Sequence, residues 1–334
     1  MKNVKLKLAL LSALTIVSTQ TFATGLVALP ATGASASSAY LECFALGQTF
    51  TSPVVAKNNY GSSGVQIPTT TADNNCATFP ANEASSPVSG FTLIASASRN
   101  VVVNNTYTNN TNVTVGTVTD RVWRNAAATS CIYGTKFVPA NIDYQPTIAC
   151  TQYFEVNDIA RGGFSGSGSV NVGYFTAVTT PPTSPVYRIG RTYTSVQHRA
   201  RAYDTAANKE LPGSGYVSLP ASASGSPASI NGVDAAIAAT TLSSATAAEQ
   251  TAAVNSNWVD FTADAVWADD DGQTSPNTPT TYVQAACTSA APAVVNDVIR
   301  LRQTAQENAR FIQVSVPGYV PPGGTASPVP VVPF

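Results

Sequence analysis

The chain offers few side chains that could do chemistry, and its single histidine is the first to consider. His198 follows a β-type run, in the segment Ser195-Val-Gln-His-Arg-Ala-Arg. Imidazole is the commonest nitrogen ligand of copper and zinc, but a metal site normally needs several converging ligands. One histidine in 334 residues therefore argues against a two-histidine metalloenzyme motif and leaves one candidate for histidine-based catalysis. The alternative is a surface or hydrogen-bonded histidine at the end of a strand.

Two other segments have the residue types of a site without the matching spacing. The Gly/Ser-rich stretch 162–169 lacks the G-x-S-x-G spacing of a serine nucleophile, and no lysine follows it to bind phosphate, so a flexible loop is expected. The acidic run Asp269–Asp271 carries oxygen ligands that suit Ca²⁺, but Trp267 occupies the first position of an EF-hand spacing. A solvated acidic turn is the expectation there, with a calcium site near Asp269–Asp271 as the alternative.

The first 23 residues have the pattern of a secretory signal. Three lysines precede a short apolar stretch from Leu8 to Val17, and the small residue Ala23 stands at the cleavage position. The apolar stretch is too short to span a bilayer, and no later segment reaches the length of a transmembrane helix. We therefore expect a secreted or outer-surface protein, with the periplasm as the other exported compartment.

Five cysteines lie beyond the signal, and export favours disulfides. No CxxC pair occurs, so a structural zinc site is not expected. We predict the pair Cys131–Cys150, because the loop between these residues is short and rich in turn residues, and the pair Cys43–Cys76. Cys287 would then be free or paired between chains.

Composition narrows the class of protein. Charged residues make up 10% of the chain and its formal net charge is −1, whereas roughly a quarter of an average soluble protein is charged. No basic tract occurs, so a nucleic-acid partner is not expected. Hydrophobic residues make up 44%, which is enough to build a core.

Short β-type runs separated by turn residues dominate the chain from residue 40 onward. A hairpin is predicted near the end, where apolar residues alternate with polar ones in 298–303 and 310–316 on either side of a polar turn. The Ala-rich stretch 234–253 predicts one or two short helices. The fold class is therefore mainly β, an antiparallel β-sandwich-like single domain with long loops and one or two short helices. The expected divisions are a signal peptide at 1–23, a flexible N-terminal segment at 24–39, a single β-rich domain at 40–320 and a Pro-rich tail at 321–334.

One further motif is more distinctive. Trp123-x-Asn125, followed far downstream by His198, resembles the copper site of the methanotroph surface proteins MopE and the copper-repressible CorA, over roughly residues 90–320. The resemblance implies that Trp123 matches a tryptophan oxidised to kynurenine and that His198 matches the second histidine ligand. Asn125 stands where the family has its first histidine, and an amide is a poor Cu(I) ligand. The resemblance also implies a surface dihaem peroxidase as the modifying partner.

Two functions follow as hypotheses. The first is a secreted, surface-associated, non-catalytic copper-binding protein, with His198, Trp123 and Asn125 at the metal. The second is a structural or adhesive extracellular surface protein without metal, in which Trp123 belongs to the core. No constellation of residues in the sequence points to a secreted enzyme.

Overall fold

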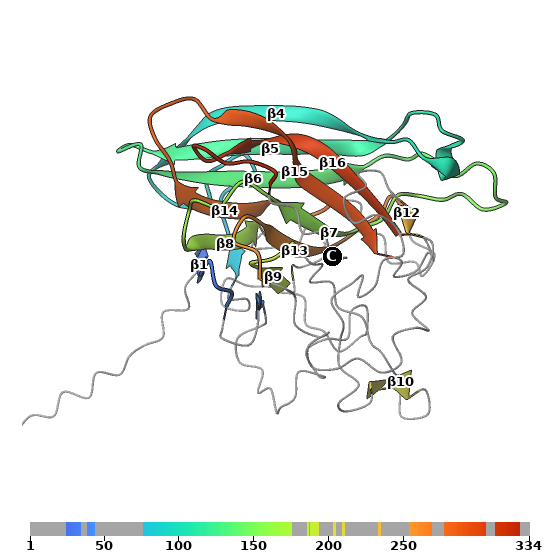
Figure 1. Ribbon diagram of the computed structural model, residues 1–334, viewed down its shortest axis with the longest axis horizontal. Helices are drawn as coiled ribbons and strands as arrows, with labels where there is room; N and C mark the ends of the chain where they lie inside the picture. Colours follow the sequence, from blue (N-terminus) through green and yellow to red (C-terminus); the bar gives the residue numbers. More distant parts are fainter. Residues whose placement is uncertain are drawn as a thin grey trace, which may run out of the picture.

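The computed structural model describes residues 25–34, 39–43, 76–175, 186, 188–193, 203–204, 209–210, 233–234, 254–268, 277–304 and 311–327. These residues are mainly β, and most of their strands belong to two large, predominantly antiparallel sheets (Figure 1). The prediction of a mainly β, sandwich-like fold is confirmed.

The first sheet contains the longest strands. Its order is β1-β8-β14-β6-β5-β4, and the short strand β3 pairs in parallel with β8. The strands are β1 (Val27–Leu29), β3 (Ala77–Thr78), β4 (Phe91–Val103), β5 (Val113–Asn125), β6 (Ser130–Pro139), β8 (Val170–Phe175) and β14 (Thr281–Ala286).

The second sheet has the order β12-β16-β15-β7-β13-β9-β2. Its strands are β2 (Tyr40–Glu42), β7 (Val156–Arg161), β9 (Arg188–Gly190), β12 (Val233–Asp234), β13 (Val259–Ala265), β15 (Ala293–Thr304) and β16 (Phe311–Val320). A separate two-stranded pair joins β10 (Tyr203–Asp204) to β11 (Lys209–Glu210).

The core lies between the sheets. On β15 and β16, alternate residues such as Ile299, Leu301 and Val314 face the first sheet, where Val118 of β5 and Phe137 of β6 meet them in one buried cluster. This alternation is the period-two pattern of a strand with one apolar face. It is also the pattern that predicted the hairpin, and the structure confirms that hairpin with Leu301 opposite Val314.

The expectations for the N-terminal segment and for helices can be compared with the described residues. Part of the expected flexible N-terminal segment carries β1, which pairs with β8. Among the described residues, helical structure is limited to one 3-10 turn, η2 (Thr106–Thr108). The predicted helices at 234–253 lie outside the described residues, except that Asp234 ends β12. No helix in the described part of the chain is long and apolar enough to cross a membrane.

Candidate functional site

Trp123 lies on the outer face of the first sheet and is covered. Successive residues of a strand point to opposite faces, so Val122 enters the core between the sheets while Trp123 joins a separate cluster with Ile132 and Tyr282. The side chain is only 1% exposed, and its ring meets that of Tyr282 edge to face at 5.8 Å. Its Nε1 donates a hydrogen bond to the carbonyl oxygen of Ala84 at 3.1 Å. The indole is therefore a packed core group whose one polar atom is already satisfied.

Asn125 shapes the turn between β5 and β6. Its Oδ1 accepts hydrogen bonds from the backbone N–H groups of Thr129, at 2.9 Å, and Ser130, at 3.0 Å. Its Nδ2 donates to Thr129 Oγ1 at 3.1 Å. Asparagine side chains commonly stabilise turns by bonding to nearby backbone groups in this way. The amide proposed as a copper ligand is thus occupied by the turn.

The other predicted metal residues cannot be joined to this pair. His198 and the acidic run Asp269–Asp271 both lie outside the described residues. Within the ranges that the structure describes, no group of three or more His, Cys, Asp or Glu side chains is placed to hold a metal ion. The copper site through His198 and the calcium site both stay predictions.

Two disulfides are present in the described part of the chain. Cys43 pairs with Cys76 as predicted. The predicted pair Cys131–Cys150 is wrong, because Cys131 is bonded to Cys287 and Cys150 is an exposed free cysteine.

Cys131 pairs with Cys287 because β6 and β14 are neighbours in the first sheet. Cys131 lies opposite Ala285 in the antiparallel pair β6–β14, and Cys287 follows two residues later, with its Cα 5.6 Å from that of Cys131. The disulfide closes a separation of 156 residues and ties the end of β14 to β6. Proximity across the sheet, rather than along the chain, therefore decides this pairing.

A buried ion pair joins the two sheets. Asp120 of β5 and Arg161 of β7 are 0% and 1% exposed, with 2.9 Å between Oδ1 and Nη1. Asp120 Oδ2 accepts a hydrogen bond from the backbone N–H of Tyr319 in β16 and lies 3.5 Å from Nη1 of Arg99. Burial raises the pKa of Asp120, although the neighbouring charge of Arg161 opposes this shift.

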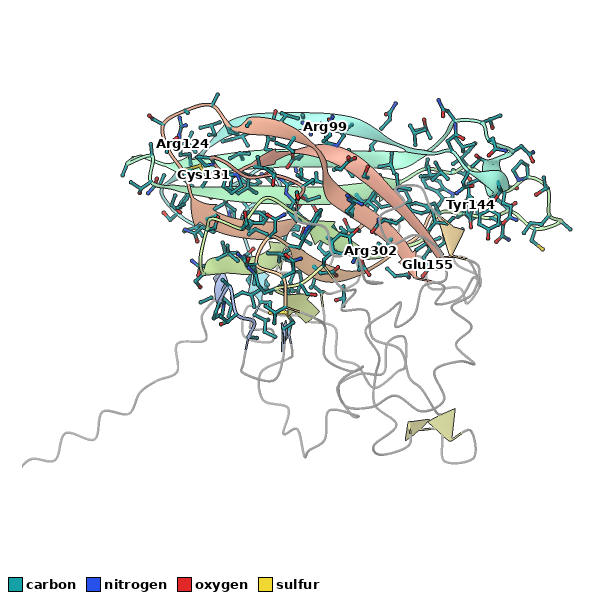
Figure 2. The ribbon with its side chains drawn as sticks, viewed as in Figure 1. Arg99, Arg124, Cys131, Tyr144, Glu155 and Arg302 are labelled. Carbon is teal, nitrogen blue, oxygen red and sulfur yellow. A yellow bond between two sulfur atoms is a disulfide. The ribbon has the colours of Figure 1, made fainter. Side chains whose placement is uncertain are left out.

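A second charged cluster surrounds Arg302 of β15, which is labelled in Figure 2. Its neighbour Leu301 belongs to the core between the sheets, so Arg302 lies on the other face of the second sheet. Arg302 of β15 is fully buried and forms ion pairs with Asp158 of β7, at 3.1 Å, and Asp260 of β13, at 2.5 Å. Its guanidinium also lies over the ring of Tyr193, 4.6 Å from the centroid. Burial alone would lower the pKa of Arg302, but the two carboxylates hold it above its ordinary value.

Arg300 lies next to Arg302 in this charged cluster and contacts two aromatic rings. Its guanidinium lies over Trp258, 5.5 Å from the ring centroid, and over Tyr193 at 5.8 Å. Such contacts are the geometry of cation–π attraction. The sequence pattern indicated arginines on the polar face of this strand, but it did not indicate that the face would be buried.

The chemistry available in these arrangements is electrostatic and structural. The pair Asp120–Arg161 holds the two sheets together, and Arg302 with its two carboxylates links neighbouring strands of the second sheet. Comparisons with protein-family models, with curated proteins and with solved structures find no match to this chain. The fold and the residues just described are therefore the basis for a function.

Proposed function

We propose that this chain is an exported, non-catalytic β-sandwich protein with a structural or adhesive role at the cell surface and no metal at Trp123. The observation that carries the proposal is that the polar atoms of Trp123 and Asn125, the two candidate ligands, already form hydrogen bonds within the fold. The indole N–H of Trp123 is donated to Ala84, and both ends of the Asn125 amide hold the β5–β6 turn.

Copper binding through these residues would require the protein to give up this packing. Oxidation of the Trp123 ring needs an oxidant to reach a side chain that is 1% exposed and enclosed by Tyr282 and Ile132. Freeing the Asn125 oxygen would leave two backbone N–H groups of the turn without their acceptor. The dihaem peroxidase partner belongs to the copper hypothesis and has no role in the structural one.

The scaffold suits an extracellular role. Two disulfides fit an oxidising compartment, and one of them closes a very long loop. The low content of charged residues and the buried ion pairs fit a stable structural protein. Export itself is supported by the signal-like first 23 residues.

Copper analysis of the purified chain tests the proposal. Wild type, His198→Ala and Trp123→Phe are equilibrated with Cu(I) and Cu(II), dialysed and measured for bound copper, with Tyr144→Phe as a control at a residue that is not part of the motif. We expect less than one tightly held copper per chain in all four proteins. One copper per chain that is lost in His198→Ala and retained in Tyr144→Phe would overturn the proposal in favour of the copper function.

Fractionation of the host cell tests the location separately. The proposal predicts that the chain occurs in the outer-surface or medium fraction and becomes labelled by a membrane-impermeant amine reagent on intact cells. Exclusive recovery from the cytoplasm would contradict it.

A further inference from the structure

The loop between β7 and β8 passes from one sheet to the other. We call residues 162–169 the Gly/Ser loop. The N–H of Phe164 donates to the backbone oxygen of Asn257 at 3.1 Å, and the N–H of Ser165 donates to Asn257 Oδ1 at 3.1 Å. Beyond these anchors, Ser165, Gly166 and Gly168 are exposed. A Cβ added at Gly166 or Gly168 would meet no atom within 4 Å, so the outer turn of the loop is loosely packed.

Arg191 lies beneath this loop. It follows β9, and its backbone is fixed on both sides, because its N–H donates to Ala39 and its carbonyl oxygen accepts from Asn255. Its side chain is completely buried. Nη2 donates to the carbonyl oxygens of Phe164, at 3.0 Å, and Gly168, at 3.1 Å, which places the guanidinium against the inner side of the loop.

The remaining donors of Arg191 are unused. Nε and Nη1 are buried and have no hydrogen-bond partner, and none of the ion pairs of the described residues includes Arg191. Among the described residues, Arg161 and Arg302 are buried to the same degree, and both are neutralised, Arg161 by Asp120 and Arg302 by two aspartates. Arg191 has only the dipoles of two carbonyl groups.

A buried cation of this kind is costly unless an anion accompanies it. Burial lowers the pKa of Arg191 to about 10, so the guanidinium remains charged at neutral pH. Guanidinium N–H groups form their strongest hydrogen bonds with the oxygens of carboxylates, phosphate and sulfate. A buried, charged donor with unmet N–H groups therefore points to an oxyanion as its missing partner.

We propose that Arg191 and the Gly/Ser loop form a binding site for a small inorganic oxyanion of the phosphate or sulfate type. An oxygen of the anion accepts from Nε or Nη1, and the loosely packed outer turn of the loop shifts to admit it. The carbonyl of Gly168 is the contact that yields, while the anchors of Phe164 and Ser165 on Asn257 stay in place. The site adds a binding activity to the surface role proposed above and does not depend on it.

Thermal unfolding of the full, disulfide-intact chain tests the site, with inorganic phosphate as the probe. Phosphate replaces chloride at constant ionic strength and pH 7. A ligand that binds only the folded state raises the ratio of folded to unfolded protein about 100-fold when its concentration is 100 times its Kd. We expect Tm in the wild type to rise with the logarithm of the phosphate concentration once this exceeds the Kd, and this rise to be absent in Arg191→Gln.

The matched control is Arg124→Gln. Arg124 also donates only to carbonyl oxygens, those of Thr288, Ser289 and Ala290, but it is not buried. This variant should keep the logarithmic rise in Tm. Phosphate also stabilises proteins generally by being excluded from their surface, but that effect is common to all variants, so the comparison between variants separates it from binding at the site.

A logarithmic rise in Tm that is present in the wild type and Arg124→Gln and lost in Arg191→Gln supports the site. The absence of this rise in the wild type, or its survival in Arg191→Gln, overturns it. If Arg191→Gln does not fold, Gly166→Asp decides, because its side chain enters open space and brings a negative charge to the mouth of the site. We expect phosphate to bind Gly166→Asp several-fold more weakly by titration calorimetry, and an unchanged Kd would overturn the proposal.

Discussion

Replacement of Arg161 by methionine tests whether the ion pair between the sheets stabilises the fold. Methionine keeps most of the side-chain length and removes the charge. Arg161 is 1% exposed and its Nη1 lies 2.9 Å from Oδ1 of a carboxylate that is 0% exposed. Removing one partner of such a pair leaves the other buried and uncompensated, which costs about 3–5 kcal/mol. Arg99 remains 3.5 Å from Asp120 and offsets part of the loss, so we expect a decrease of about 4 kcal/mol or slightly less in the free energy of unfolding at pH 8.

The loss should depend on pH, with a sign that follows from Asp120. Burial already raises the pKa of this carboxyl, and removing Arg161 removes the largest influence that lowers it. A carboxyl whose pKa is higher in the folded state stabilises the fold below the unfolded-state pKa, and this contribution is lost as pH rises through the folded-state pKa. Between these two values the stability of Arg161→Met should fall by up to about 1.4 kcal/mol per pH unit relative to a chain without the group.

Urea unfolding between pH 4 and pH 8, with both disulfides intact, measures the effect. The control is Lys136→Met, which breaks the pair of Lys136 with Glu83 at 2.5 Å. Those side chains are 16% and 19% exposed, so solvent screens the pair and we expect a loss of only about 1 kcal/mol. A loss below about 1 kcal/mol in Arg161→Met, or one that is equal at pH 4 and pH 8, would refute this account of the buried pair.

Two further predictions concern packing and covalent links. Gly134→Ala should cost about 1–3 kcal/mol, because the added Cβ would lie 2.6 Å from the ring of Trp123; chemical denaturation checks this, and an unchanged stability would show that Trp123 is not held as described. Cys287→Ser should lower the free energy of unfolding by about 2–5 kcal/mol by opening the long loop closed with Cys131. Cys150→Ser is its control, since Cys150 is exposed and unpaired, and a similar loss in both serine variants would contradict the assigned disulfide.

The sequence was sufficient to predict the parts of the fold that depend on local patterns. Alternation along β15 and β16 predicted their hairpin, because Ile299 and Leu301 need an apolar face whatever lies opposite. The same alternation did not predict the burial of Arg300 and Arg302, which lie at the polar positions of β15. Their burial depends on what covers the second sheet, which alternation within one strand does not encode.

The buried ion pair and the second disulfide also depend on contacts that local patterns do not predict. Asp120 alternates with the apolar residues Val118 and Val122, and this position is a local signal of a buried charge. Its partner Arg161 is distant in the sequence and could not be identified from spacing. The pairing of Cys131 with Cys287 was missed for the same reason, because short loops were favoured over neighbours across a sheet.

The central claim is that Trp123 is an unmodified core residue in an exported scaffold without copper at this position. The intact native mass and copper content of the protein isolated from its own host test this most directly. The account predicts a chain without its signal, with two disulfides, an unoxidised Trp123 and no stoichiometric copper. A copper ion bound together with a mass gain localised to Trp123 would contradict it.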